Sequence, residues 1–528
     1  MSESALSPAR RARLAALAFL LGLCALIPQL GAAPLGDPSE ARYAEAAREM
    51  YQSGDWLTPR VNGLIHFTKP PLTYWLGAAS FKLLGGPSEF AARLPVALAG
   101  AGLCALSALI AMELLGGAGF FAALLLAGSP AFLIMGRLFL TDMFLALAVA
   151  AFYRPLLGAL LRDSPLRFGD RAWIFAAAAA GFLAKGPVFF LWTLLPLAIF
   201  AWAAPRSRPQ IRAAIGWPFI AGLLATLPWF LANMAAHAGL WKYFLFNQSV
   251  KALVSSKEFH PGAPLVFYIP SLLLIALAFL PALWKILRGA FARDAAMADS
   301  LRSPAAILLA CWITPPLLLL SLIPAKHETY ILPLAAPLAI FGAFGLARLS
   351  AMARRLCLFL SVIFILLFHL FQWVLFAAPA AGLPGALPLR ARFAAKNLKP
   401  GVALVARIAG ESGTVVLVEN YSPSFFFYLA RPVLLVNPTI AGRFVNDEPA
   451  PQLLPDLETG LETVWAGEKA PVLVFYKYQY MAFAARHPEA MIAGEDDRFV
   501  ILTPRPGAPR TAWHGRMQWA ADAAEPRR

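Results

Sequence analysis

The feature that most constrains this chain is a series of apolar stretches, each near the ~20 residues that an α-helix needs to cross the hydrocarbon of a bilayer. Only 14% of the 528 residues are charged and 59% are hydrophobic, which leaves too little polar surface to cover a soluble globule. We therefore expect a mostly α, polytopic membrane protein with about eleven transmembrane helices. The candidate spans are 14–33, 92–113, 118–135, 140–161, 172–185, 187–204, 213–235, 264–284, 304–323, 330–347 and 356–378.

The formal net charge of +16 is explained by basic residues in the loops between the spans. We therefore expect no nucleic-acid partner. If the basic N-terminus is cytoplasmic, the arginines and lysines between spans gather on the cytoplasmic side, as the positive-inside rule requires. The first span is expected to stay as an anchor, because the residues after it do not resemble a signal-peptide cleavage site. The basic residues that set this topology include Arg10, Arg11, Arg13, Arg162, Arg167, Arg171, Arg206, Arg208, Arg212, Lys285, Arg288, Arg348, Arg354 and Arg355.

This topology places the loop 34–91, the loop 236–263 and the residues after about 380 outside the cytoplasm. We expect residues 1–379 to form the transmembrane domain, with interfacial helices in the first outer loop, 34–91. Residues 380–528 are expected to form a soluble α/β domain, with a poorly ordered tail from about residue 503. Its apolar β-type runs are Val415–Val418, Val433–Val436, Val472–Phe475 and Phe499–Leu502.

Three lysines lie at the outer ends of predicted spans: Lys69, Lys185 and Lys326. Insertion of a lysine into a helix centre costs roughly 2.5–3.5 kcal/mol, so a basic residue near a span needs a partner or a function. Lys69 and Lys185 each precede a proline and then an apolar helical run, an arrangement that suits phosphate at a helix N-terminus. The alternative is that each lysine reaches to the interface. Together with Arg137, the three favour an anionic ligand such as a phosphodiester lipid head group.

The acids of the first outer loop have a structural interpretation as well as a functional one. Asp37-Pro38-Ser39-Glu40 fits a capping box that starts a helix from Pro38 to Tyr51. On this helix Arg42 could pair with Glu45. An apolar stripe suited to lying on the bilayer consists of Tyr43, Ala46, Ala47 and Met50.

Asp142 lies at the outer end of the fourth span, on the same side as the three lysines. An ionisable residue in such a position indicates a functional site. The structural alternative is that Asp142 caps its helix together with Thr141.

The order of these residues resembles the GT-C glycosyltransferases of bacteria. The similarity is greatest to the lipid A aminoarabinose transferases and weaker to the protein O-mannosyltransferases. It covers roughly residues 14–378, while the C-terminal domain matches only in position and type. The segments that carry it are Glu40-Ala41-Arg42-Tyr43-Ala44-Glu45, Arg48-Glu49-Met50, Gly54-Asp55-Trp56, Pro59-Arg60-x-Asn62-Gly63, Lys69-Pro70-Pro71-x-x-Tyr74-Trp75, Thr141-Asp142, Lys185-Gly186-Pro187, Pro228-Trp229, His260 and Lys326 with Thr329-Tyr330-Ile331-Leu332-Pro333.

The resemblance implies inverting transfer of a sugar from a polyprenyl (undecaprenyl) phosphate carrier to lipid A, a glycan or a protein outside the bacterial cytoplasmic (inner) membrane. It implies donor phosphate binding by Lys69, Lys185 and Lys326. It implies catalytic carboxylates among Asp37, Glu40 and Asp142, one of which would deprotonate a hydroxyl acceptor. The expected substrate cavity contains Arg42, Tyr43, Arg137, His260 and Tyr330.

The chain departs from this family's pattern at two places. Many relatives have adjacent Asp-Glu before the Arg-Tyr pair, whereas this chain has Ser39-Glu40, so either Asp37 or Glu40 could be the base. Relatives also often carry a carboxylate, proposed as a metal ligand, just before the Lys-Pro pair, where this chain has Thr68. No cofactor is therefore assigned, and a divalent metal held with help from His66 and His260 stays open.

Two other functions are compatible with the same pattern. A transporter or flippase of polyprenyl-linked lipids would also use lysines at the outer face and a groove for the lipid. A non-catalytic binding module would use the C-terminal domain as a receptor.

Overall fold

The computed structural model describes residues 6–237, 239–240, 263–292, 294–377, 397–438, 452–454, 456–465, 471–484, 491–496 and 498–503. The predicted tail beyond Thr503 and the candidate His260 lie outside these residues. The chain divides into two compact units, which are Met1–Ala33 with Thr68–Pro384, and Pro34–Phe67 with Gly385–Arg528. The first half of the predicted outer loop 34–91 thus folds with the C-terminal residues.

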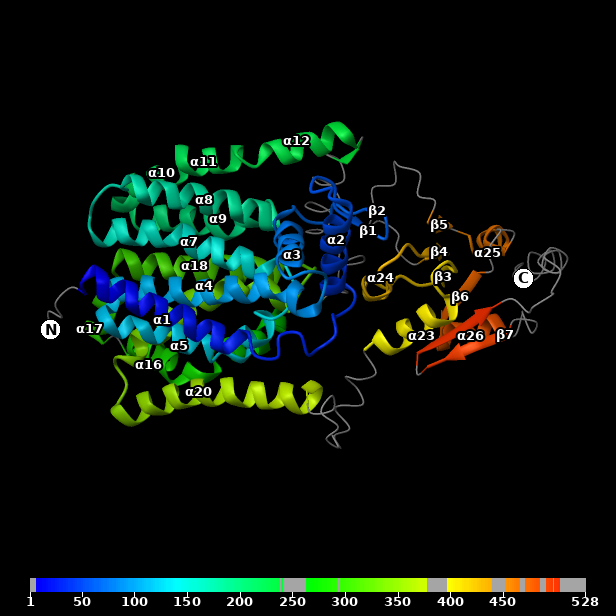
Figure 1. Ribbon diagram of the computed structural model, residues 1–528. Helices are drawn as coiled ribbons and strands as arrows, with labels where there is room; N and C mark the ends of the chain where they lie inside the picture. Colours follow the sequence, from blue (N-terminus) through cyan, green and yellow to red (C-terminus); the bar gives the residue numbers. More distant parts are fainter. Residues whose placement is uncertain are drawn as a thin grey trace, which may run out of the picture. The chain divides into compact units, whose positions relative to one another are not determined.

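The first unit consists of helices, many of which run side by side (Figure 1). Its longer helices are α1 (Pro8–Leu26), α3 (Leu72–Leu83), α4 (Glu89–Leu115), α7 (Asp142–Leu161), α8 (Phe168–Lys185), α9 (Val188–Ala203), α12 (Leu227–Ala236), α16 (Leu280–Phe291), α18 (Pro304–Leu322), α19 (Ala335–Leu346) and α20 (Ala351–Gln372). Shorter ones are η1 (Gly116–Phe120), α5 (Phe121–Ala127), α6 (Pro130–Met135), η2 (Pro205–Ser207), α10 (Arg208–Ile215), α11 (Trp217–Leu224), η4 (Leu265–Tyr268), α15 (Ile269–Ala276), η5 (Leu277–Phe279), α17 (Ala295–Leu301), η6 (Glu328–Leu334) and η7 (Trp373–Ala377).

The mostly helical, multi-pass membrane architecture is confirmed, whereas the number of eleven spans is not. In the described part of the chain, seven helical segments are long and apolar enough to cross a membrane, and Val188–Ala203 is a shorter apolar helix. One of the seven, Glu89–Ala127, contains two elements that fold back on each other, since α5 and η1 both contact α4.

Two glycines allow the chain to reverse its direction between α4 and α5. Gly116 adopts φ 58°, in the left-handed region that favours glycine. A Cβ at Gly119 would lie 2.2 Å from the backbone nitrogen of Met112, so only glycine allows this close approach.

Helix α7 lies at the centre of the first unit. About 78% of the most apolar stretch of α7 is buried inside the protein, against 11% for the segment Ala351–Phe376 that contains α20. Tyr153 of α7 stacks on Trp312 with ring centroids 4.5 Å apart, and its hydroxyl donates to the carbonyl oxygen of Trp192 at 2.9 Å. Helix α20 instead exposes large apolar side chains, which lipid would cover in a membrane protein.

The second unit contains a six-stranded mixed sheet in the order β5-β4-β3-β6-β8-β7. Strands β3, β4, β5 and β6 are parallel, while β8 is antiparallel to both β6 and β7. The four predicted β-type runs coincide with β3, β4, β6 and β8. The strands are β3 (Thr414–Val418), β4 (Leu434–Val436), β5 (Leu453–Leu454), β6 (Pro471–Tyr476), β7 (Met491–Glu495) and β8 (Phe499–Thr503), and the helices are α23 (Lys399–Ala409), α24 (Pro423–Leu429), α25 (Leu457–Trp465) and α26 (Lys477–Ala484).

Residues 34–67 contribute a helix and a hairpin to this second unit. Helix α2 (Ser39–Ser53) packs against α24, and strands β1 (Arg60–Val61) and β2 (Leu64–Ile65) form an antiparallel pair. Asn62 and Gly63 between them have φ 54° and 74°, as a two-residue hairpin turn of the Asn-Gly type requires. The apolar stripe of α2 is buried in the folded protein, so we do not assign it to the bilayer surface; it consists of Tyr43, Ala46, Ala47 and Met50.

Candidate functional site

Three predicted site residues come together in the helical unit. Asp142 begins α7 and Lys185 ends α8, so both lie at the same end of this antiparallel pair. Their side chains form a buried ion pair between Lys185 Nζ and Asp142 Oδ1, and each is less than 10% exposed. Lys185 Nζ also lies 4.5 Å from the centre of the Tyr330 ring, within the range of a cation–π contact. The site is thus a buried cation held between a carboxylate and an aromatic face.

Lys326 is a second buried lysine in this unit, with 4% of its surface exposed. Its Nζ donates to the carbonyl oxygen of Ala263 at 2.8 Å. Within the described ranges it forms no ion pair with a carboxylate. An ammonium has three donors, and a buried positive charge is costly unless an anion compensates it. Lys326 is therefore suited to bind an anionic group.

Tyr268 belongs to the same region, although sequence reasoning missed it. This residue of η4 is 1% exposed and interacts electrostatically with Asp142 and Tyr330. Its buried hydroxyl lies next to the backbone of His327. The sequence offered only a tyrosine near a span end, which is common in membrane proteins. Its hydroxyl adds a donor to the two lysines.

The other two basic candidates differ in their surroundings. Lys69 is partly exposed and lies just before α3, which begins at Leu72 as the proline signal predicted. Arg137 is 6% exposed and donates through Nη1 to the carbonyl oxygens of Leu26 at 2.9 Å and Pro28 at 2.7 Å. Since α1 ends at Leu26, these bonds satisfy carbonyls at a helix C-terminus. Arg137 thus has a structural task in the helical unit.

In the second unit, the predicted capping box at the start of α2 is wrong. The N-cap of α2 is Pro38, with no side-chain cap, and Glu40 Oε2 accepts from the backbone N–H of Gly36 at 2.8 Å. Asp37 instead binds residues that lie more than 380 positions later: it accepts from Ser422 Oγ at 2.6 Å and from Ser424 N and Oγ at 2.8 and 2.5 Å. Both carboxylate oxygens of Asp37 are occupied.

The predicted pairing of Arg42 with Glu45 does not form. Glu45 pairs with Arg48 instead, through two contacts of 2.6 Å to the guanidinium. The Nε of Arg42 is buried and has no hydrogen-bond partner in the described part of the chain, and Tyr43 is 8% exposed. Arg42 and Arg48 each lie three residues from Glu45 in the sequence, and in the folded chain Glu45 pairs with Arg48.

The residues do not outline a metal centre in the part of the chain that the structure describes. No three side chains of the types His, Cys, Asp and Glu gather there in a way that could hold an ion. His66 is fully buried.

Two comparisons of sequence link the chain to known families. Residues 35–244 match the family model described as dolichyl-phosphate-mannose-protein mannosyltransferase. The undecaprenyl phosphate-alpha-4-amino-4-deoxy-L-arabinose arabinosyl transferase 1 of Sodalis glossinidius is 34% identical over 62% of this chain and 58% of its own length. The corresponding transferase of Pectobacterium carotovorum is 30% identical over 63% and 59%. The chain therefore spans less than two thirds of the length of these relatives.

Solved structures confirm the fold. ArnT from Cupriavidus metallidurans, bound to undecaprenyl phosphate, superposes with a TM-score of 0.73 at 21% identity, over 93% of this chain and 97% of its own. The oligosaccharyltransferase of Archaeoglobus fulgidus gives 0.51 at 12% identity, over 82% and 65%. The predicted resemblance to GT-C glycosyltransferases, and in particular to lipid A aminoarabinose transferases, is confirmed.

Proposed function

We propose that this chain, whose fold is that of ArnT, is an inverting glycosyltransferase that moves a sugar from a polyprenyl phosphate carrier to an acceptor outside the cytoplasm. The observation that carries the proposal is Lys326, a buried ammonium with no carboxylate partner among the described residues. A lipid phosphate would supply the missing charge. The names of the curated relatives, which specify undecaprenyl phosphate-linked aminoarabinose, support the same donor class.

The chemistry follows from the charge that develops on the leaving group. When the bond between the anomeric carbon and the phosphate oxygen breaks, negative charge accumulates on the phosphate. Lys326 and Lys185, which are both buried, would stabilise that charge, with the Tyr268 hydroxyl as a further donor. Asp142 holds the Lys185 ammonium in place through their ion pair. Lys69, at the start of α3, is proposed as a third phosphate ligand.

The general base remains a proposal between two residues of the second unit. The two candidates are Asp37, whose oxygens accept from Ser422 and Ser424, and Glu40, which accepts from the backbone N–H of Gly36. A hydroxyl acceptor would need such a base, whereas a phosphate acceptor, as on lipid A, is already ionised and would need only positioning. Arg42, whose buried Nε has no hydrogen-bond partner among the residues that the structure describes, is proposed to contact an anionic substrate.

The orientation is proposed from charge placement in the helical unit. Arg162 and Arg167 lie at the end of the α7–α8 pair opposite Asp142 and Lys185. Under the positive-inside rule the basic end is cytoplasmic, so the buried ion pair lies on the periplasmic side of the inner membrane.

The experiment is transfer by the reconstituted full chain, with undecaprenyl phosphate-linked aminoarabinose as the first donor and lipid A as the first acceptor. Lys326→Gln should lower turnover by roughly 10²–10³-fold, as loss of one charge-stabilising donor does elsewhere, and Lys69→Ala should also lose transfer. Lys285→Gln, an exposed lysine on α16, is the matched control and should keep wild-type turnover. Movement of the lipid without a new covalent sugar product would instead identify a flippase. Wild-type turnover by Lys326→Gln would refute the assigned phosphate site.

A further inference from the structure

A group of charged side chains and one tryptophan lies at the end of the helical unit opposite Asp142 and Lys185. Its members come from helices that contact one another in the order α1, α4, α7 and α8. None of them is proposed above to take part in transfer. The group, called the basic cluster below, consists of Arg11 of α1, Glu113 of α4, Arg154 of α7, Arg162 directly after α7, and Asp170 and Trp173 of α8.

Two members of the basic cluster compensate each other. Arg162 Nη2 lies 3.1 Å from Asp170 Oδ2, and the same oxygen accepts from the backbone N–H of Arg167 at 3.0 Å. A Cβ at Gly158 would lie 2.9 Å from Nη1 of Arg162 and 3.2 Å from Oε2 of Glu113. The glutamate of α4 thus lies against α7, close to a guanidinium that already has its carboxylate.

The three remaining charged groups of the cluster are close together but do not pair. Glu113 interacts electrostatically with Arg154 and Arg11. Within the described ranges, however, neither arginine forms a hydrogen bond or an ion pair with it. The Nε atoms of Arg11 and Arg154 and the Oε2 atom of Glu113 are buried without a hydrogen-bond partner among the described residues. The hydrogen-bonding capacity of these three side chains is therefore largely unused.

The basic cluster carries one positive charge in excess. Arg162 is balanced by Asp170, which leaves the two guanidiniums of Arg11 and Arg154 with the single carboxylate of Glu113. Both arginines are half-buried, and their Nη groups reach the surface without a hydrogen bond to the described part of the chain. A guanidinium binds phosphate oxygens through two parallel N–H donors. The cluster is therefore suited to a phosphate that carries one negative charge.

The depth of Arg154 indicates where that phosphate comes from. Arg154 lies seven residues before the last residue of α7, a distance of about 10 Å along a membrane-spanning helix. Its Cζ is 5.9 Å from the centre of the Trp173 ring, and Trp173 is 46% exposed. Exposed tryptophans are typical of the boundary between hydrocarbon and head groups. A lipid phosphate reaches this level while its acyl chains stay in hydrocarbon, whereas a dissolved anion would have to leave water.

We infer that the basic cluster binds the head group of an anionic phospholipid, with the phosphate at Arg154 and Arg11. Phosphatidylglycerol, with one net negative charge, matches the one positive charge in excess. Phosphatidylethanolamine carries the same phosphate but also an ammonium, so it would leave that excess uncompensated. Basic sites between membrane helices bind anionic head groups on this principle. The inference does not depend on the transfer reaction.

The test is lipid binding by the full-length chain in detergent, measured by native mass spectrometry. Phosphatidylglycerol and phosphatidylethanolamine with identical acyl chains are titrated separately. Wild type should bind phosphatidylglycerol about fivefold more tightly, the contribution expected of one basic residue at a lipid surface. Arg154→Gln and Arg11→Gln should each weaken this binding about fivefold. Arg288→Gln, which replaces an exposed arginine in the last turn of α16, is the matched control and should bind like wild type.

The opposite change is expected for Glu113→Gln. This variant keeps the shape of the side chain and removes the carboxylate that competes with the lipid phosphate, so it should bind phosphatidylglycerol more tightly than wild type. Weaker binding by Glu113→Gln would contradict the charge argument. Circular dichroism and thermal melting of each variant establish that it is folded.

Three outcomes would overturn the inference. The first is equal affinity of the wild type for the two phospholipids, and the second is wild-type binding of phosphatidylglycerol by Arg154→Gln. The third is weaker binding of undecaprenyl phosphate, but not of phosphatidylglycerol, by Arg154→Gln, which would assign the cluster to the sugar carrier. Because binding is measured without sugar transfer, failure here leaves the proposed function standing, and an inactive wild type that binds as expected leaves the lipid site standing.

Discussion

The side-chain amide of Asn62 forms two hydrogen bonds with the backbone of Val433. Its Nδ2 donates to the Val433 carbonyl oxygen at 2.7 Å, and its Oδ1 accepts from the Val433 N–H at 2.9 Å. Asn62 is 2% exposed and Val433 is fully buried. This amide therefore satisfies two backbone groups that water cannot reach, besides supplying one of the two left-handed residues of the hairpin turn.

Replacement of Asn62 should destabilise the second unit. Asn62→Ala leaves the Val433 N–H and carbonyl unsatisfied, at a cost of about 1–3 kcal/mol for each buried group. It also places alanine at a left-handed φ. Asn62→Asp tolerates that conformation better but loses the bond to the carbonyl, so it separates the two effects. Thermal melting and limited proteolysis should show both variants weakened, alanine more than aspartate. Wild-type melting of Asn62→Ala would contradict this role.

Asp37 and Glu40 should behave oppositely when each is replaced by its amide. Asp37→Asn disturbs the bonds from Ser422 and Ser424, so it should lower the melting temperature and keep turnover in the molecules that remain folded. Glu40→Gln can still accept from Gly36 and keeps the length of the side chain, so it should melt closer to wild type than Asp37→Asn does, and it should lose transfer. Turnover per folded molecule and melting of the two variants are the measurements. The reverse pattern would make Asp37 the base.

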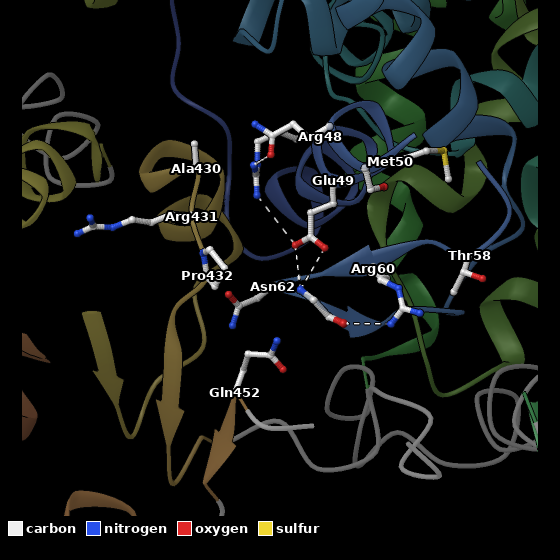
Figure 2. Close-up of a pocket in the computed structure, with 13 residues that line it drawn as sticks. Arg48, Glu49, Met50, Thr58, Arg60, Asn62, Ala430, Arg431, Pro432 and Gln452 are labelled. Carbon is white, nitrogen blue, oxygen red and sulfur yellow. Dashed lines mark hydrogen bonds and ion pairs between the residues drawn. The ribbon is translucent and has the colours of Figure 1, made fainter. Parts of the chain in front are cut away.

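The stability of the second unit should fall as the pH rises through about 8. Glu49 has a raised pKa of about 8 in the folded chain, whereas the unfolded value is near 4.5. The folded state thus binds the Glu49 proton more tightly, and this contribution is complete below about pH 4.5 and lost above the folded pKa. Among the described residues, the charged groups around it are Glu45 and Arg48 on α2, Arg60 on β1 and Arg431 before β4, and Figure 2 shows the three arginines with Glu49.

Glu49→Gln provides the check on that pH dependence, because it keeps the shape of the side chain and removes its titration. Melting temperatures of wild type and variant should be compared from pH 5 to pH 9. The wild type should lose stability relative to the variant across this range. A constant difference would mean that the pKa of Glu49 is not raised. Glu411→Gln, at an exposed position, is the control and should leave the wild-type profile unchanged.

Loss of one partner of the Asp142–Lys185 ion pair should destabilise the protein more than loss of both partners. Asp142→Asn leaves the buried Lys185 ammonium without its carboxylate, and Lys185→Gln leaves a buried carboxylate, each at about 3–5 kcal/mol. The double variant carries neither charge and should melt closer to wild type than either single variant. It should nevertheless fail to transfer sugar. Additive losses in the double variant would show that the two side chains do not stabilise each other.

The sequence predicted the elements that depend on local pattern. Apolar β-type runs gave four strands of the sheet, and the prolines after Lys69 and Lys185 marked the starts of α3 and α9. The Asn62-Gly63 pair belongs to the family pattern and is also a signal for a two-residue hairpin turn. The number of eleven spans is not confirmed, because helices such as α4 and α5 follow each other almost without interruption.

Partners that depend on the fold could not be predicted. The capping box was a reasonable interpretation of Asp37-Pro38-Ser39-Glu40, but Asp37 binds Ser422 and Ser424, which no local rule connects to it. Tyr268 was missed for the same reason, since only the packing of η4 brings its hydroxyl near Asp142. By contrast, Asp142 and Lys185 stood out because charge at the end of an apolar span is costly and needs compensation.

Residues 34–67 fold with the C-terminal part of the chain, so the second unit cannot complete its folding until that part has been synthesised. Asn62 leaves the ribosome 371 residues before Val433, and at about 5–20 residues per second this interval is about 20–75 s. During that interval α2 and the hairpin have no sheet to pack on, and the helical unit is synthesised in between. The second unit therefore completes folding only after synthesis is nearly finished. A nascent chain truncated before β4 should leave the hairpin open to protease, whatever the state of its membrane helices.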